Sequence, residues 1–239
     1  MPSNAAELAS RICDNLARVR ENIASAAARS GRTPESVKLV GVTKYVEPAI
    51  ARLLVDAGLK DLGESRPQEL WQKAEVLGDV PVFWHMIGHL QRNKVKRTLP
   101  LVTCIHTADS LRLLQAISTE AVALNRPAHV LLEINISGDA AKHGFQSDEI
   151  EPLLSQIATL KNIDVVGLMT MAGLDGGLDR TRHDFAALRE LSERLKPKCS
   201  HNIAMNELSM GMSGDYEVAI EEGATIVRVG SALFEVIEV

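Results

Sequence analysis

The chain has 239 residues, of which 46% are hydrophobic and 24% charged, and these fractions exclude a disordered, collagen-like or low-complexity chain. Aromatic residues make up only 3%, so aliphatic side chains must fill the core, and this disfavours an all-β sandwich. The formal charge of −5 and the lack of basic runs argue against a nucleic-acid or anionic-membrane partner and favour a small-molecule ligand.

The cysteines are odd in number and widely spaced, which favours a reducing compartment over a disulfide framework or a zinc site. We interpret Cys13, Cys104 and Cys199 as packing residues. The N-terminal segment lacks the apolar stretch of a signal peptide, and no later stretch has the ~18 consecutive apolar residues of a membrane-spanning helix. The sequence therefore predicts a cytoplasmic protein without a membrane segment.

The first predicted element is an amphipathic helix over residues 4–30. Asn4 and Glu7 resemble a capping box at its start, and Gly31 provides a stop. Apolar residues recur every three or four positions along it, at Leu8, Ile12, Leu16, Val19 and Ile23.

Eight short β-like runs follow, and segments with helical periodicity separate them. The predicted strands cover residues 38–43, 61–64, 82–88, 102–107, 130–136, 165–170, 206–210 and 225–230. The helical segments include residues 48–57, 110–124, 149–160, 181–195 and 215–222. Successive strands begin about 27 residues apart, close to the roughly 30 residues of one βαβ unit.

Eight β-then-α units predict a (β/α)8 TIM barrel with an extra N-terminal helix, forming a single domain over residues 1–239. An open, doubly wound sheet is the alternative, because the runs at 61–64 and 206–210 are short and polar. In a barrel, functional residues lie at the C-terminal ends of the strands and in the loops that follow them. This rule selects the candidate residues below.

Lys44 directly follows the first predicted strand. A lysine amine in a partly desolvated pocket can form a Schiff base with an aldehyde or ketone. The alternative interpretation is a lysine that is ion-paired or extends into solvent at a strand end.

Two turns at the ends of the last two strands carry features of a phosphate site. Ser213 and Gly214 precede the last helical segment, and Gly230 and Ser231 follow the eighth strand. Backbone N–H groups at a helix start and serine hydroxyls bind anions, and these two loops form the usual phosphate site of phosphate-binding barrels. Ser213 could equally be only a helix cap.

Arg228 has the opposite parity from its neighbouring valines in the eighth strand, so it can point into the barrel. A buried guanidinium needs a partner. The two candidates are a barrel carboxylate, such as Glu64 or Glu133, and an acceptor atom on a ligand.

The histidines offer weaker signals. His85 and His89 are four residues apart but belong to a strand and a loop, and no neighbour in the sequence completes a metal site, so we expect no metal there. Lys142 and His143 follow the fifth strand and are further candidates for lining the site.

Six segments, in chain order, resemble the motifs of the pyridoxal phosphate homeostasis protein family. They are GVTK, DLGES, WHMIGHLQRNK, INISGDAAKHGF, GLMTMAG and ELSMGMSGDYEVAIEEGATIVRVGSALF, and together they span nearly the whole chain. The family's barrel is similar to the N-terminal domain of alanine racemase, in the fold-type III group of pyridoxal phosphate proteins.

The resemblance implies that pyridoxal 5′-phosphate (PLP) is the cofactor and that Lys44 carries it as an aldimine. It also implies that Arg228 is the partner of the pyridine nitrogen, and that the phosphate-binding residues are Ser213, Gly214, Gly230 and Ser231. The chain departs from the family at Ser65, where asparagine is common, so no cofactor contact is carried over to this position.

The implied function is that of a PLP carrier in intracellular vitamin B6 homeostasis, with apo forms of PLP-dependent enzymes as recipients. Alanine racemase uses a tyrosine from another domain and subunit as its second base, and neither Tyr45 nor Tyr216 is an obvious substitute. Arg228 also weakens the ring as an electron sink, because a guanidinium keeps the pyridine nitrogen unprotonated. The alternatives are a fold-type III amino-acid racemase and a lysine-dependent aldolase.

Overall fold

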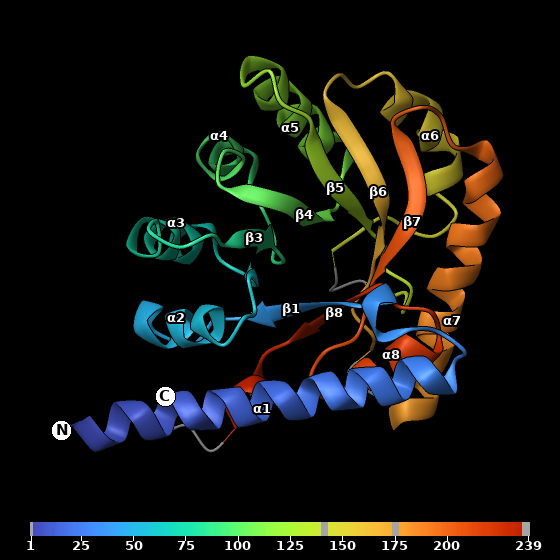
Figure 1. The fold of residues 1–239 in the computed structure, drawn as a ribbon. Coiled ribbons are helices and arrows are strands. Elements are labelled where there is room, and N and C mark those ends of the chain that lie inside the picture. The colour runs from blue at the N-terminus through green and yellow to red at the C-terminus, as the bar shows by residue number, and fades with distance from the viewer. Residues whose placement is uncertain (1, 140–142, 174–176, 236–239) are drawn as a thin grey trace.

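The computed structural model describes residues 2–139, 143–173 and 177–235, and its eight parallel strands form a closed barrel in the order β1 to β8 (Figure 1). The predicted (β/α)8 barrel is confirmed. The open-sheet alternative is wrong, because β1 pairs with β8 as well as with β2. The strands are β1 Lys38–Val42, β2 Asp61–Glu64, β3 Phe83–Met86, β4 Val102–Ala108, β5 Ala128–Glu133, β6 Ile163–Met169, β7 Ile203–Ser209 and β8 Ile226–Val229.

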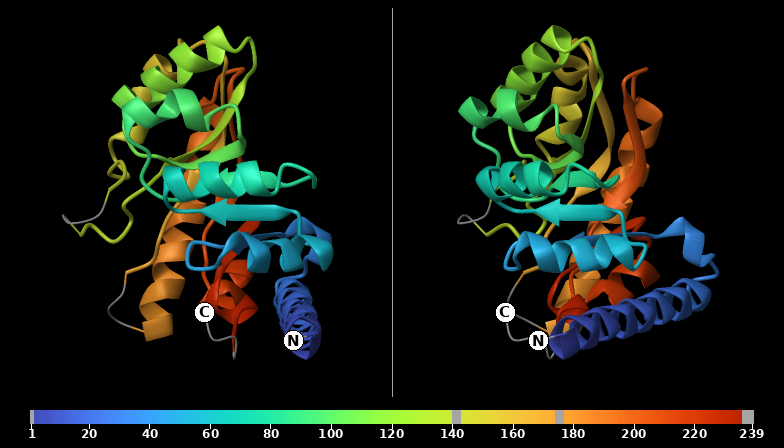
Figure 2. Two further views of the ribbon diagram at one scale, coloured as in Figure 1. Left: turned by 90° about the vertical axis from the view of Figure 1, so that its left-hand side faces the viewer. Right: turned by 60° about the vertical axis from the view of Figure 1, so that its left-hand side comes forward.

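Helices connect the strands around the outside of the barrel (Figures 1 and 2). Pro48 and Pro67 begin α2 and α3, where the missing N–H and fixed φ of proline cost nothing. The connecting helices are α2 Pro48–Asp56, α3 Pro67–Val76, α4 Val95–Thr98, α5 Leu111–Ala123, α6 Ile150–Ala158, α7 Gly177–Leu195 and α8 Tyr216–Glu221. The short 3-10 turns are η1 Pro34–Ser36, η2 Arg92–Lys94, η3 Lys196–Lys198 and η4 Ser231–Leu233.

Helix α1 spans Pro2–Arg29, so it starts before Asn4 and the predicted capping box is wrong. The chain turns at Gly31, whose φ of +70° favours glycine. The predicted apolar stripe is buried at Ile12, Leu16, Val19 and Ile23. This stripe packs α1 against α8, α2 and η4, so that α1 covers the barrel beside β8 (Figures 1 and 2).

Several strand bounds differ from the predicted ones. Strand β7 begins at Ile203, three residues earlier than predicted, and β5 ends at Glu133 although apolar residues continue beyond it. Ile134 leaves the strand and forms an isolated bridge with Phe145, and it stays buried there. An apolar run in the sequence therefore indicates buried residues, and at this loop the buried residues continue past the end of the strand.

The core has two parts. The larger part fills the space between the sheet and the helices, and the smaller part lies inside the barrel. The inner residues come from five different strands and are Val40, Cys104, Leu131, Met169 and Ile226. Cys104 is thus buried, whereas Cys13 is exposed, so the packing interpretation is wrong for Cys13.

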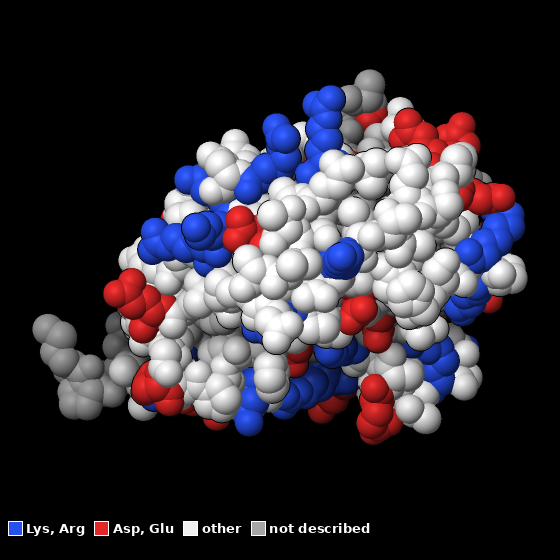
Figure 3. All heavy atoms as spheres, turned by 90° about the horizontal axis from the view of Figure 1, so that it is seen from above, with Lys and Arg blue, Asp and Glu red and all other residues white. Residues whose placement is uncertain are grey.

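Charged residues of both signs are interspersed on the face seen in Figure 3. Among the helices of the described residues, none is both long enough and apolar enough to cross a membrane.

Candidate functional site

Lys44 lies two residues beyond β1, at the C-terminal edge of the barrel. Its side chain is exposed, and Nζ lies 4.8 Å from the centroid of the Tyr45 ring. The lysine therefore lies at the strand end as predicted, but its side chain is in solvent rather than in a partly desolvated pocket.

The loops after β7 and β8 meet at Ser213. Its Oγ accepts hydrogen bonds from the backbone N–H groups of Gly230, at 3.1 Å, and Ala232, at 3.3 Å. Two N–H groups directed at one oxygen form the arrangement that binds an anionic oxygen. The cap interpretation of Ser213 is wrong, because the N-cap of α8 is Asp215.

Gly211 allows the β7 loop to turn toward this point. Its φ is +92°, and a Cβ there would lie 2.6 Å from the Cβ of Ala219. The backbone N–H of Met212 then donates to Asp215 Oδ1 at 2.5 Å. Burial raises the pKa of the Asp215 carboxyl, while that hydrogen bond and Arg228 act against the rise.

A cavity of about 720 Å³ lies beside these loops. Ser213, Gly214 and Ser231 line it together with Tyr45, the neighbour of Lys44. Helix α1 contributes Arg18 and Asn22 to the same cavity. Sequence reasoning missed Arg18, because α1 precedes the barrel and nothing in the local sequence places it against the last two loops.

Arg228 lies in the barrel interior and is 4% exposed. Its Nη1 donates to Ser209 Oγ at 2.5 Å and its Nη2 donates to the Thr170 carbonyl at 3.0 Å. Burial lowers the pKa of the guanidinium to about 10, although the charges of Asp215 and Glu133 raise it. The predicted orientation into the barrel is confirmed, but the hydrogen-bond partners are a hydroxyl and a carbonyl rather than a carboxylate.

Glu64, one of the carboxylates considered for Arg228, faces α3 instead. Its Oε1 lies 2.6 Å from Lys73 Nζ and accepts a hydrogen bond of 2.6 Å from Thr43 Oγ1. Lys73 Nζ also donates to the Thr43 carbonyl at 2.6 Å. Of the alternatives considered for Arg228, the pairing with Glu64 is wrong, because this carboxylate forms its ion pair with the buried Lys73.

Glu133, the other carboxylate considered for Arg228, is the last residue of β5. Burial, and to a smaller extent the negative charge of Asp109, raises the pKa of its carboxyl group to about 7. The adjoining loops bring His89 Nδ1 to 2.9 Å from Asp109 Oδ2 and stack the rings of His89 and His143 at 4.5 Å. These groups come from the ends of three strands, which explains why no local motif marks them. Lys142 lies outside the described residues.

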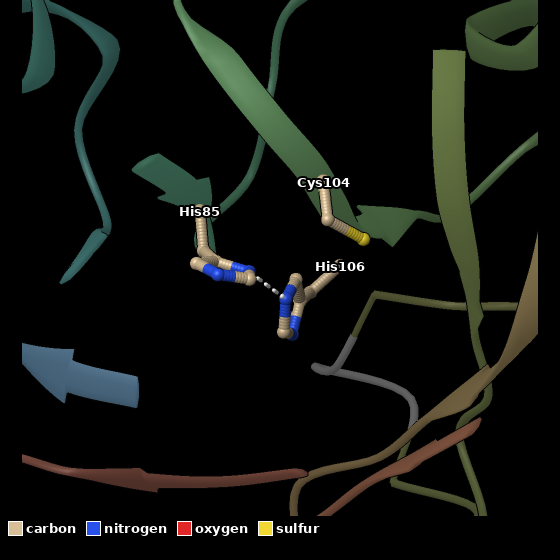
Figure 4. A group of neighbouring side chains, drawn as sticks. All are labelled: His85, Cys104 and His106. Atoms are coloured by element: carbon tan, nitrogen blue, oxygen red, sulfur yellow. Dashed lines mark hydrogen bonds between the residues drawn. The ribbon is translucent and has the colours of Figure 1, made fainter. Parts of the chain in front are cut away.

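A second histidine group lies inside the barrel. His85 of β3 and His106 of β4 point toward each other, with Cys104 beside them (Figure 4). The sequence indicates no further ligand residue near His85. This is wrong, because the possible ligand atoms of His85, Cys104 and His106 lie within 4.8 Å of one another.

Ser65 lies at the turn between β2 and α3. A Cβ at Gly88 would lie 2.2 Å from the Ser65 carbonyl oxygen, so the loops after β2 and β3 touch here. The close backbone contact requires glycine at position 88.

Comparison with known proteins identifies the family. The alanine racemase N-terminal domain family matches residues 15–237. The pyridoxal phosphate homeostasis protein of Aquifex aeolicus is 42% identical over 93% of this chain and 96% of its own length. The chain therefore belongs to the pyridoxal phosphate homeostasis protein family. The protein of the same name from Escherichia coli is 35% identical over 93% of this chain and 95% of its own length.

Solved structures of similar proteins have the same barrel fold. PipY of Synechococcus elongatus, solved with PLP bound, has a TM-score of 0.83 and 32% identity and covers 93% of this chain and 99% of its own. Alanine racemase of Clostridium difficile has a TM-score of 0.71 at 19% identity, and this chain covers 56% of it. That second likeness shows a shared fold alone.

Proposed function

We propose that this chain binds PLP at the C-terminal end of the barrel, with the aldehyde carbon joined to Lys44 and the phosphate held by the loops after β7 and β8. The observation that carries the proposal is the convergence of the Gly230 and Ala232 N–H groups on Ser213 Oγ, beside a cavity that Tyr45 also lines. The bound PLP of the family relative PipY supports it.

The chemistry at Lys44 is a condensation. The neutral Nζ adds to the aldehyde carbon, a C=N bond replaces C=O, and the oxygen leaves as water. The exposed position of Lys44 lets PLP enter and leave. PLP supplies the aldehyde, and the chain supplies the amine, the anion-binding loops and the guanidinium of Arg228 directed at the ring nitrogen.

We propose further that the chain carries PLP to apo-enzymes in the cytoplasm rather than turning over a substrate. Tyr216 accepts a hydrogen bond of 3.0 Å from Asn22 Nδ2 on α1. This contact limits the movement that the hydroxyl would need to act as a base. Tyr45 is 76% exposed and stands beside Lys44. Neither tyrosine therefore supports fast proton transfer opposite the lysine.

The experiment is a spectral titration of the purified protein with PLP, followed by reduction with borohydride and mass mapping. A yellow complex with a pyridoxyl group on Lys44 is expected. Mixing the complex with an apo-enzyme then measures transfer as regained activity. A protein that stays colourless, or a label on another lysine, contradicts the proposal.

An amino-acid racemase is the second candidate, and the acid–base groups at the barrel mouth favour it. Glu133 has a pKa near neutrality, and the His89–Asp109 pair lies at the same end of the barrel. Incubation with L-amino acids in deuterium oxide separates the two functions. Sustained α-proton exchange at enzyme-like rates supports the racemase, and its absence supports the carrier.

A further inference from the structure

Five polar side chains form a continuous hydrogen-bonded column through the barrel interior. The column starts at Asp61, whose side chain is 24% exposed at the N-terminal end of β2, and ends at Arg228. The links are Asp61 Oδ1 to His85 Nε2 at 3.0 Å, His85 Nδ1 to His106 Nε2 at 2.9 Å, His106 Nδ1 to Ser209 Oγ at 2.9 Å, and Ser209 Oγ to Arg228 Nη1 at 2.5 Å.

The donors and acceptors at the two ends of the column are consistent with one continuous arrangement of its protons. A carboxylate only accepts, so Asp61 accepts from His85 Nε2. A guanidinium only donates, so Ser209 Oγ accepts from Arg228 and can donate its own hydroxyl proton to His106 Nδ1. His106 then carries its proton on Nε2 and donates to His85 Nδ1, and His85 Nε2 donates to Asp61. In this arrangement each ring carries one proton, on Nε2. Burial lowers the pKa of His106 well below its usual range, which agrees with a neutral ring.

The column runs from a cation to an anion, and each bond polarises the next. The guanidinium of Arg228 is thereby connected to the carboxylate of Asp61 without touching it. Lys38 Nζ lies 3.8 Å from Asp61 Oδ1 and balances the far end. A buried arginine with several rotatable bonds is thus held in one orientation by Ser209 and by the Thr170 carbonyl.

A metal ion bound by His85, Cys104 and His106 is the competing interpretation of the same residues (Figure 4). It would require the lone pairs of His85 Nδ1 and His106 Nε2, and these two atoms already share a hydrogen bond. It would also move the His106 proton to Nδ1 and so reverse the hydrogen bond between His106 and Ser209. The hydrogen-bonded column satisfies all four ring nitrogens, so the geometry favours it.

We propose that Ser209, His106 and His85 are positioning residues that hold Arg228 toward the pyridine nitrogen of PLP. This inference rests on the proposed function, because it takes Arg228 as the partner of the ring. The column contributes to the ring contact and not to the phosphate or the aldehyde. Its loss therefore weakens recognition of the ring nitrogen selectively.

The test compares PLP with its carbocyclic analogue, in which C–H replaces the ring nitrogen. Ser209→Ala is expected to weaken PLP binding about tenfold, because a charge-assisted contact is misplaced, and to leave binding of the analogue unchanged. Asp61→Asn, at the partly exposed end, is expected to weaken only PLP binding by about threefold. If Ser209→Ala does not fold, Asp61→Asn serves as the test variant. Cys104→Ala is the matched control, since it changes the same interior without touching the column.

Equal losses for both compounds, or no loss for either, overturn the positioning role and leave the proposed function intact. A parent protein that binds neither compound overturns the proposed function and the positioning role with it.

Nitrogen-15 NMR of labelled histidine tests the column without PLP. Neutral Nε2–H rings at His85 and His106 are expected, and Ser209→Ala should shift the His106 signals. If added Zn²⁺ moves the His106 proton to Nδ1 and Cys104→Ala abolishes the change, the group is a metal site and the inference is wrong.

Discussion

Ser213 and Lys44 hold opposite ends of PLP in the proposed complex, so their substitutions have different effects. The hydroxyl of Ser213 organises the N–H groups of Gly230 and Ala232, and Ser231 lines the same cavity. Each charge-assisted hydrogen bond to phosphate contributes roughly 1.5–3 kcal/mol. The phosphate contact and the covalent bond are therefore separable.

Ser213→Ala combined with Ser231→Ala is expected to weaken PLP binding by about one to two orders of magnitude per lost hydroxyl contact, while some yellow complex still forms at Lys44. Spectral titration measures the affinity, and transfer to an apo-enzyme should become faster. Ser36→Ala, on the exposed η1 turn, is the control. Unchanged affinity in the double variant would place the phosphate elsewhere.

Lys44→Ala should have the inverse effect, namely retained but weaker PLP binding without the visible absorbance of the Schiff base. The phosphate loops remain intact in this variant, so fluorescence or equilibrium dialysis should still detect the ligand. Lys44→Arg is the matched variant that keeps the positive charge but cannot condense with the aldehyde. Visible absorbance of the usual kind in either variant would assign the bond to another amine.

At the scale of elements, a buried ion pair ties α3 to β1 and β2. Lys73 Nζ contacts both Glu64 and the Thr43 carbonyl, and Glu64 Oε2 is buried without a hydrogen-bond partner among the described residues. The carboxylate is therefore held by one oxygen. The loss of Lys73 should therefore destabilise the fold more than the loss of one partner of an ordinary surface ion pair.

Lys73→Met is expected to lower the free energy of unfolding by about 3–5 kcal/mol, because it leaves a buried charge uncompensated. Adding Glu64→Leu should recover much of this loss, since the charge then disappears with its partner. Urea unfolding of the parent, both single variants and the double variant measures the coupling. Additive effects would show that the pair does not interact.

Helix α1 stabilises the barrel through its apolar face. Leu16 is 1% exposed, and Asn15 Nδ2 donates to the carbonyl groups of Leu233 and Glu235 at 3.2 Å each. Leu16→Ala should therefore cost about 2–5 kcal/mol in unfolding free energy, through lost burial and a cavity. The exposed Glu21→Ala on the same helix is the control in urea unfolding, and equal effects of the two would mean that α1 is not docked.

For the whole molecule, repeating apolar patterns were enough to predict the barrel. The alternation of strands and helices predicts β2 with its observed bounds and predicts the presence of β7, although both predicted runs are short and polar and β7 begins three residues earlier than predicted. The pattern could not reveal side-chain partners from different strands, so it offered Arg228 a barrel carboxylate or a ligand atom and missed Ser209, 19 residues away in the chain. It missed the His85–His106 pair for the same reason, because the pairing of β3 with β4 brings together residues that are 21 positions apart in the chain.

The barrel also buries Glu133, and this predicts a pH dependence of the stability of the whole fold. Burial raises its pKa from 4.5 to about 7, so the folded state binds this proton more tightly than the unfolded state. The stabilisation is complete below pH 4.5 and is lost as the pH rises through about 7. The loss is about 3–4 kcal/mol at most, because the pKa rises from 4.5 to about 7 and each pKa unit corresponds to about 1.36 kcal/mol.

Glu133→Gln should remove this dependence, so that the variant gains stability relative to the parent as the pH rises from 4.5 to 7.5. His106 acts in the opposite direction over part of this range, because its lowered pKa makes the fold lose stability as the pH falls below about 6.5. The contribution of His106 is common to variant and parent, so it cancels in the difference between their unfolding free energies. Urea unfolding at several pH values, with the exposed Glu75→Gln as control, measures this difference. A difference that stays constant with pH would mean that Glu133 titrates alike in the folded and unfolded chains.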